Sequence, residues 1–267
     1  MAIREGYVTI DNNVIIDYVR FGKGSQPMVI IPGLNTRDVK GAGFGLWYMY
    51  RMFAKDYTVY CIDRRRDVPE GITTRQIAED YAAAMKALHI ENAYVFGVSH
   101  GGMIAQYLAI EHPNLVAKAV LGVTASRPNE TMRRCISRWI DMTKRGDYKA
   151  LNADTMQSMY SAEYNRKHKL LIAMMSAFVK PANPEKFIRL AQSTLDADTY
   201  ERLNEIHCPV LVLGGRMDQV TTAAGSEEIA AKLGCRIYMY ETLGHAAYDE
   251  GKDFNKRVFE FFAEQAG

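Results

Sequence analysis

One serine of this sequence lies in a pattern typical of an enzymatic nucleophile. Gly97, Ser99 and Gly101 belong to a G-x-S-x-G pentapeptide that follows an apolar run at residues 93–96 and precedes a helical stretch beginning at His100. A serine on such a sharp strand-to-helix turn points its hydroxyl off the edge of a sheet. The helix N-terminus also offers backbone N–H groups to a developing negative charge. The flanking context therefore favours a nucleophilic serine over an incidental one.

A serine hydroxyl attacks effectively only when a base takes its proton and a third group orients that base. Asp218 follows an apolar run at residues 210–213, and His245 lies in a loop after the last such run. Functional groups collect at the carboxyl ends of strands in open α/β sheets. The chain order Ser, Asp, His suits this architecture. We therefore expect Asp218 to orient His245, with Asp249 and Asp196 as the alternative acids.

The elements that must position these residues alternate along the chain. Two alternating stretches around a short turn predict an antiparallel hairpin at residues 7–19. Fully apolar runs predict strands at residues 28–31, 57–62, 93–96, 117–121, 210–213 and 236–240, and helical periodicity predicts helices at 73–88, 100–111 and 254–263. Strands that are apolar on both faces belong to a parallel sheet between two layers of helices. The expected fold class is α/β: a mostly parallel twisted sheet with an antiparallel N-terminal hairpin and helices on both faces.

One long interval interrupts the alternation. Residues 125–207 show helical periodicity and no clear strand pattern. Such an interval is too long for a simple connection inside a compact domain. We therefore expect a helical cap at 125–207, inserted into a core made of residues 1–124 and 208–267.

The side chains of this insert suggest what the cap does. It is rich in methionine and aromatic residues. Methionine is flexible and polarizable, so it suits a lid that adapts to varied apolar groups. Most of these residues should hold the cap helices together, but the insert must fold over the sheet edge that carries Ser99. The candidates for lining a substrate pocket are Trp139, Met159, Tyr160 and Met174.

Taken together, the chain resembles the α/β-hydrolase superfamily over essentially its whole length, in the capped serine branch of esterases and lactonases. Residues 97–102 match the nucleophile elbow of that superfamily, and Asp218 and His245 match its acid and histidine positions. The resemblance implies a catalytic triad of Ser99, Asp218 and His245 that needs no metal and no organic cofactor. Haloalkane dehalogenases and epoxide hydrolases of the superfamily carry an aspartate at the elbow, so Ser99 argues against their chemistry.

The oxyanion hole of such an enzyme needs two backbone donors. One should be the N–H of His100, whose side chain we give no role, and the other should be the N–H of Leu34. Relatives commonly have His-Gly where this chain has Pro32 and Gly33. Because the donors are main-chain groups, the difference leaves the hole intact and puts in doubt only the hydrogen bonds of that histidine.

The expected reaction is hydrolysis of a carboxylic ester, lactone or thioester of a small to medium, mainly apolar substrate through an acyl-serine. The same triad also serves carbon–carbon bond hydrolases, perhydrolases and acyltransferases. Some superfamily members are ligand-binding receptors with little turnover. The fold alone does not choose among these functions.

A run of three arginines follows the strand predicted near residue 60. Arg64, Arg65 and Arg66 could bind a carboxylate or phosphate on the substrate. More often such a run is a solvated loop paired with neighbouring acids, here Asp67 and Glu70.

Composition limits the kinds of binding partner that we expect. The net charge of +2 gives no argument for nucleic acid, and no stretch approaches the roughly 18 apolar residues of a membrane span. The first residues are charged, unlike a secretory signal, and the four cysteines show no CxxC spacing. We therefore expect a reduced, cytoplasmic protein that binds a small-molecule substrate, without nucleic-acid or membrane partners. The sequence does not indicate an oligomeric state.

Overall fold

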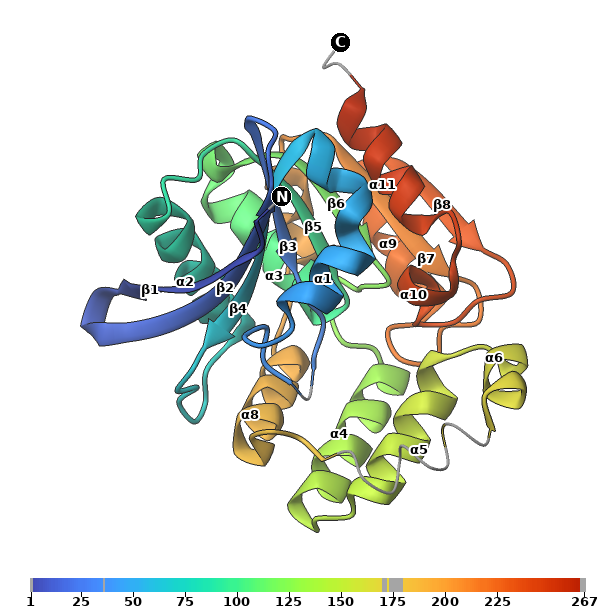
Figure 1. Cartoon of the computed structure of the whole chain (residues 1–267). Coiled ribbons are helices and arrows are strands. Elements are labelled where there is room, and N and C mark those ends of the chain that lie inside the picture. Colours follow the sequence, from blue (N-terminus) through green and yellow to red (C-terminus); the bar gives the residue numbers. More distant parts are fainter. Residues whose placement is uncertain (1, 36, 170–171, 173–179, 265–267) are drawn as a thin grey trace.

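The computed structural model describes residues 2–35, 37–169, 172 and 180–264. Its centre is an eight-stranded sheet with the order β1-β2-β4-β3-β5-β6-β7-β8 (Figure 1). The strands are β1 (Arg4–Ile10), β2 (Val14–Gly22), β3 (Gln26–Ile31), β4 (Tyr57–Arg65), β5 (Ala93–Val98), β6 (Val116–Gly122), β7 (Val210–Gly215) and β8 (Arg236–Tyr240). Strand β2 pairs antiparallel with β1 and β4, and the other neighbours are parallel. The predicted mostly parallel sheet with an N-terminal hairpin is confirmed.

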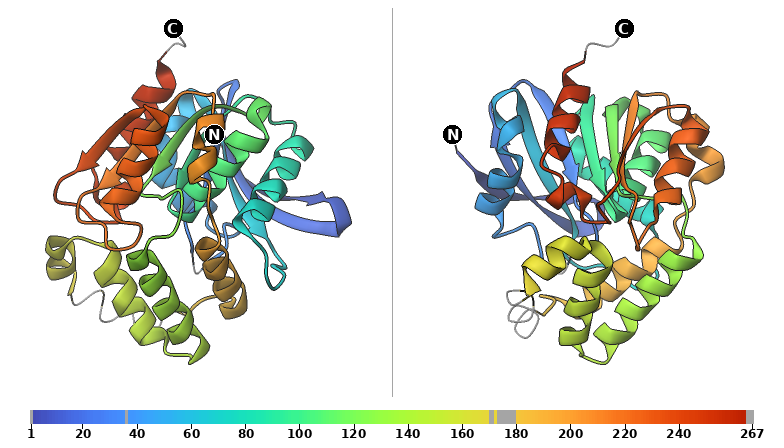
Figure 2. Two further views of the ribbon diagram at one scale, coloured as in Figure 1. Left: turned by 180° about the vertical axis from the view of Figure 1, so that it is seen from behind. Right: turned by 90° about the vertical axis from the view of Figure 1, so that its right-hand side faces the viewer.

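Helices cover both faces of the sheet (Figure 2). Helices α1 (Gly43–Tyr50) and α11 (Phe254–Ala263) contribute to one apolar cluster, and α2 (Thr74–Ala87), α3 (His100–Glu111) and α9 (Ala223–Leu233) contribute to the other. Successive strand residues point to opposite faces. In β7, for example, Val212 belongs to the second cluster, whereas Leu211 and Leu213 belong to the first. This two-sided burial is why the strand runs are apolar throughout.

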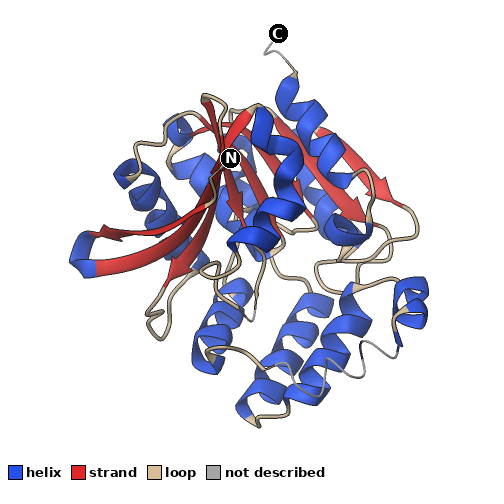
Figure 3. Ribbon diagram, viewed as in Figure 1, coloured by secondary structure: helices blue, strands red, loops and turns tan. Residues whose placement is uncertain are grey.

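The helical insert follows β6 and precedes β7 in the chain. In Figure 3 the lower part of the molecule consists of helices and loops, apart from the strands. The described helices of the insert are α4 (Glu130–Lys144), α5 (Tyr148–Met159), α6 (Ala162–Lys167) and α8 (Pro184–Leu195). They form a layer beyond the carboxyl ends of the parallel strands (Figure 1). Helix α4 is amphipathic: Met132, Ile136 and Trp139 are buried at helical spacing. The division of the chain at residues 125 and 207 stays a prediction.

Two features are absent from the described residues: a membrane-spanning helix and a cluster of metal ligands. None of the described helices is long and apolar enough to cross a membrane. Within the same part of the chain, no group of three or more His, Cys, Asp or Glu residues is arranged to hold a metal ion.

Candidate active site

Ser99 lies on a strained turn between β5 and α3. Its backbone has φ 54° and ψ −120°, a region that costs a residue with a side chain roughly 1–3 kcal/mol. The turn is tight enough to require glycine around it: a Cβ on Gly101 would lie 2.0 Å from the carbonyl oxygen of Ile31. Because the turn closes in so few residues, the Ser99 hydroxyl stands at the carboxyl edge of the sheet. The predicted strand–turn–helix context of Ser99 is therefore present.

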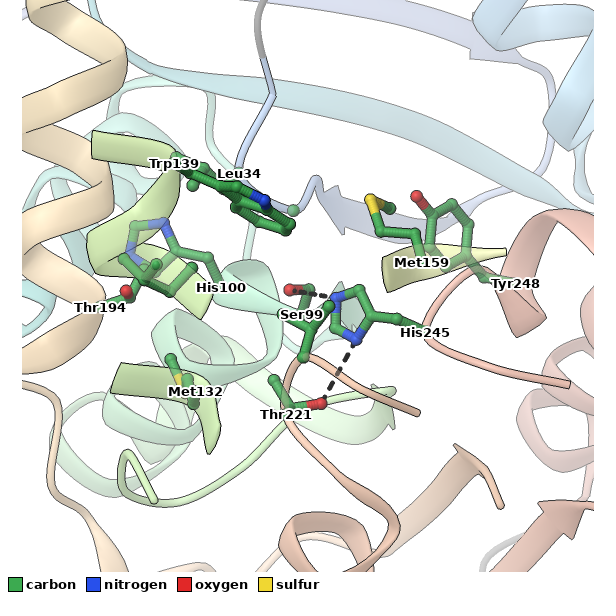
Figure 4. Close-up of a pocket in the computed structure, with 13 residues that line it drawn as sticks. Leu34, Ser99, His100, Met132, Trp139, Met159, Thr194, Thr221, His245 and Tyr248 are labelled. Atoms are coloured by element: carbon green, nitrogen blue, oxygen red, sulfur yellow. Dashed lines mark hydrogen bonds between the residues drawn. The ribbon is translucent and has the colours of Figure 1, made fainter. Parts of the chain in front are cut away.

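Three side chains from separate loops meet at this edge, and Figure 4 shows two of them, Ser99 and His245. His245, which follows β8, places Nε2 2.8 Å from Ser99 Oγ. Its other ring nitrogen, Nδ1, lies 2.8 Å from Oδ2 of Asp218, which follows β7. His245 is 2% exposed and Asp218 is 7% exposed, so water competes little for these contacts. The structure thus brings together the three residues that the sequence proposed as a triad.

The surroundings of Asp218 fix its charge. Its carboxylate accepts hydrogen bonds from the backbone N–H groups of Val220 (2.7 Å) and Thr221 (3.0 Å) and lies 2.8 Å from the Thr221 hydroxyl. Burial raises the pKa of Asp218, but the charge of His245 and these hydrogen bonds outweigh it, so the pKa is below its usual value. An ionised carboxylate only accepts, so His245 Nδ1 carries a proton. In a neutral imidazole, Nε2 is then free to accept the Ser99 hydroxyl proton.

The alternative acids lie elsewhere. Asp249, on α10 (Ala247–Glu250), accepts a hydrogen bond of 2.8 Å from the Tyr160 hydroxyl. Asp196 is exposed at the end of α8. Tyr160 does not line the cavity beside Ser99, and its role in binding substrate stays a prediction. Helix α5 ends at Met159 and Tyr160 is extended, so its ring turns toward α10 instead.

A cavity of about 30 Å³ lies beside Ser99, between the sheet edge and the insert. The predicted residues Leu34, Trp139 and Met159 line it, and Met174 lies outside the described residues. The same three residues also line a neighbouring hollow of about 370 Å³. Leu34, Trp139 and Met159 therefore stand between the small space at Ser99 and the larger one.

The loop after β3 brings backbone donors next to Ser99. A Cβ on Gly33 would lie 3.3 Å from Ser99 Cβ, and Leu34 lines the cavity. Among the hydrogen bonds of the described residues, none uses the N–H of Leu34 or that of His100. His100 is the first residue of α3, where an N–H has no partner inside the helix. Both proposed oxyanion donors are thus near Ser99 and unengaged.

The arginine run is not the solvated loop that the sequence suggested. Strand β4 extends to Arg65, and Arg65 and Arg66 form ion pairs with Asp80 and Asp17 rather than with the adjacent acids. Arg64 is 1% exposed. Its Nη2 donates to the carbonyl oxygens of Pro32 and Gly33, the latter at 2.8 Å.

This contact orients the loop after β3. In a trans peptide the C=O and N–H groups point in opposite directions. Because the Gly33 carbonyl points toward Arg64, the Leu34 N–H points away from Arg64, and Leu34 lines the cavity on that side. Sequence reasoning named Arg64 as a possible anion-binding residue but missed this role, because a run of charges normally indicates a surface.

Several side chains of the cavity wall were not predicted from the sequence, among them those of His100 and Tyr248. The imidazole of His100 lines the cavity and is 1% exposed, although only its backbone was given a role. Burial and the charge of Arg64 hold the pKa of His100 well below its usual value, so the ring is neutral. Tyr248, three residues after His245, also lines the cavity. No spacing signal in the sequence singles out Tyr248.

Comparison with known proteins agrees with this geometry. Residues 26–252 match the family described as the alpha/beta hydrolase fold. The chain belongs to this family. Its mostly parallel sheet, its serine turn and the helices between β6 and β7 agree with what the resemblance implied.

The relatives within the family are hydrolases, and their sequence identity to this chain is low. The 3-oxoadipate enol-lactonase 2 of Acinetobacter baylyi is 23% identical over 237 residues, which cover 86% of this chain and 84% of that protein. The 2-hydroxy-6-oxononadienedioate/2-hydroxy-6-oxononatrienedioate hydrolase of Paraburkholderia xenovorans is 28% identical over 296 residues, covering 98% of this chain and 94% of that protein. The crystal structure of the enol-lactonase from Burkholderia xenovorans LB400 is similar with a TM-score of 0.83 at 22% identity, covering 97% of this chain and all of that one.

Proposed function

We propose that this chain is a serine hydrolase that cleaves a carboxylic ester, lactone or thioester through an acyl-serine intermediate. The observation that carries the proposal is the chain of two 2.8 Å contacts from Ser99 through His245 to Asp218. Similarity to two enol-lactonases supports including cyclic esters among the substrates.

Each group has a role in the reaction. His245 takes the Ser99 proton as the oxygen attacks the carbonyl carbon, and the N–H groups of Leu34 and His100 hold the oxyanion. The imidazolium then gives its proton to the departing alcohol or thiol. Water, activated by the same histidine, releases the acid. Asp218 keeps the imidazole in the productive tautomer and stabilises its charged form.

The cavity supports a small to medium, neutral substrate. Its lining includes the apolar side chains of Leu34, Ile136 and Met159, and no Lys, Arg, Asp or Glu is among the described residues that line it. None of the three arginines lines this cavity: Arg65 and Arg66 pair with Asp80 and Asp17, and Arg64 is buried against the carbonyl oxygens of Pro32 and Gly33. A substrate larger than this cavity would extend past Leu34, Trp139 and Met159 into the neighbouring hollow of about 370 Å³.

This proposal predicts a profile across p-nitrophenyl esters from acetate to palmitate. Each buried methylene contributes roughly 0.8 kcal/mol to binding, so kcat/KM should rise with acyl length over short chains. It should fall once the acyl chain fills the cavity and the neighbouring hollow. An ester with a terminal carboxylate should react more slowly than its neutral counterpart. A maximum of kcat/KM at palmitate would indicate an open groove. Faster cleavage of the anionic ester would indicate that the arginine run binds the substrate after all. Steady turnover distinguishes an enzyme from a receptor, which would give one burst and then stall.

Arg64 offers a test of the proposed oxyanion hole. Arg64→Met keeps the apolar bulk but frees the carbonyls of Pro32 and Gly33, so the Leu34 N–H loses its fixed direction. We expect kcat to fall by about 10–100-fold with KM little changed, since an oxyanion donor acts mainly in the transition state. Arg66→Met, which loses the ion pair with Asp17 but no contact to the loop after β3, is the matched control. Equal effects of the two substitutions on kcat would contradict this role of Arg64.

A further inference from the structure

The side chain of His100 is a buried polar group that the proposed mechanism does not use. Its Nε2 lies 3.2 Å from the Thr74 hydroxyl oxygen and 3.4 Å from that of Ser193. Thr74 already donates its proton to the Ser193 carbonyl oxygen (2.6 Å), and Ser193 donates its own to the Leu190 carbonyl oxygen (2.8 Å). Each hydroxyl has a single proton, so both can only accept from the imidazole. Nε2 therefore carries the ring proton.

This tautomer leaves Nδ1 with a lone pair and no partner. Among the described residues no group donates to Nδ1, although the atom is buried. The ring nitrogens of an imidazole point in roughly opposite directions. Nε2 faces Thr74 and Ser193, neither of which lines the cavity, whereas His100 does. A buried acceptor without a donor is unfavourable, so such an atom needs an explanation.

A second acceptor lies on the same wall. The hydroxyl of Thr194, which also lines the cavity, donates its proton to the Ala191 carbonyl oxygen at 2.7 Å. Its remaining lone pairs can only accept. The cavity wall also includes the apolar side chains of Met132, Ile136 and Trp139 from α4, of which Figure 4 labels Met132 and Trp139.

We propose that His100 Nδ1 accepts a hydrogen bond from a hydroxyl or N–H group of the substrate, so that the enzyme selects esters or lactones carrying such a donor near the scissile carbonyl. The donor group of the substrate must lie near its scissile carbonyl, because His100 directly follows Ser99 in the chain. This inference rests on the proposed function, since it assigns the substrate class of that same site. A methyl group in place of the donor would leave Nδ1 unpaired in an apolar wall. An ether oxygen would place two acceptors against each other.

The test compares matched esters that differ only in the donor. The acyl pairs are p-nitrophenyl 2-hydroxybutanoate with 2-methylbutanoate, and 3-hydroxybutanoate with the achiral 3-methylbutanoate, plus 3-methoxybutanoate. Both enantiomers of each chiral ester are used. The leaving-group pair is 2-hydroxyethyl butanoate with propyl butanoate. For at least one pair, kcat/KM should favour the hydroxyl by about tenfold or more. His100→Met should bring that ratio to about one, whereas His89→Met, at an exposed histidine, should leave it unchanged.

A binding measurement separates this inference from the proposed function. In the Ser99→Ala protein, ¹⁵N spectra of the histidine rings should show His100 protonated at Nε2 only. Methyl 3-hydroxybutanoate or methyl 2-hydroxybutanoate should shift its Nδ1 resonance, whereas methyl 3-methylbutanoate should not. This experiment needs no turnover and no substitution at His100.

The outcomes are distinct. If the wild-type protein hydrolyses no ester but the Nδ1 resonance shifts, the proposed function fails and the acceptor site stands. If esters are hydrolysed but every hydroxyl-to-methyl ratio is near one or below and Nδ1 does not respond, the acceptor site is wrong and the proposed function stands. A hydroxyl preference that His100→Met leaves intact also overturns the assignment to His100.

Discussion

Replacing Ser99 by alanine should lower kcat for ester hydrolysis by about 10⁴–10⁶-fold, as removal of a nucleophile does in other serine hydrolases. The substitution removes one oxygen atom and keeps the Cβ on the strained turn. Hydrogen bonds that hold this turn, such as the one from the Ser99 N–H to the Gly122 carbonyl oxygen (2.8 Å), are backbone contacts and survive. Steady-state assays against a p-nitrophenyl ester measure the loss.

The fold should survive this substitution. We expect the free energy of unfolding to stay within about 1 kcal/mol of wild type, because no packing group is lost. Denaturant unfolding of both proteins is the control. Substantial activity in a folded, sequence-verified Ser99→Ala protein would remove Ser99 from the mechanism.

Neutralising the acid should have the second largest effect. In Asp218→Asn the amide can donate toward His245 Nδ1, which then accepts, so Nε2 carries the proton and faces the Ser99 hydroxyl in the wrong tautomer. We expect kcat to fall by about 10⁴-fold, as for the corresponding change in a well-studied triad. The readout is kcat at a pH where the wild type is fully active.

Asp249→Asn is the matched control for the acid. Asp249 interacts with Tyr160, and an asparagine oxygen can still accept that hydrogen bond. Its kcat should therefore change no more than a few-fold. If Asp249→Asn were the more damaging substitution, the acid would have been assigned to the wrong loop.

Much of the site could be predicted because its signals are local. The turn at Ser99 is marked by glycines within two residues, and Asp218 and His245 each follow an apolar run that becomes a strand. Once those runs form one parallel sheet, their carboxyl ends share an edge. Local patterns thus sufficed for the elements, the order of the three residues and the loops that carry them.

The remaining features depend on contacts between distant segments. Arg66 pairs with Asp17, 49 positions away, and Arg64 holds a loop 31 positions away. Nothing within the run shows that one arginine turns inward while its neighbours pair elsewhere. The orientation of Tyr160 toward Asp249 likewise depends on tertiary structure, because these two residues are 89 positions apart in the chain.

His100 illustrates the same point at the cavity wall. From the sequence it is the residue after Ser99, and only its N–H has an expected role. Its side chain matters because Thr74 and Ser193, 26 and 93 positions away, engage Nε2 and leave Nδ1 unpaired. Hydrogen-bond direction, unlike hydrophobic periodicity, is not encoded in neighbouring residues.

The central claim is that Ser99 forms the covalent intermediate, and active-site labelling tests it most directly. The protein is treated with a fluorophosphonate, digested and analysed by mass spectrometry while residual ester hydrolysis is followed. We predict one phosphonyl group per chain, on Ser99, with activity lost in proportion to labelling and no reaction in the His245→Ala protein. Complete inactivation with the adduct on another residue, or full ester hydrolysis by protein labelled at Ser99, would contradict the account.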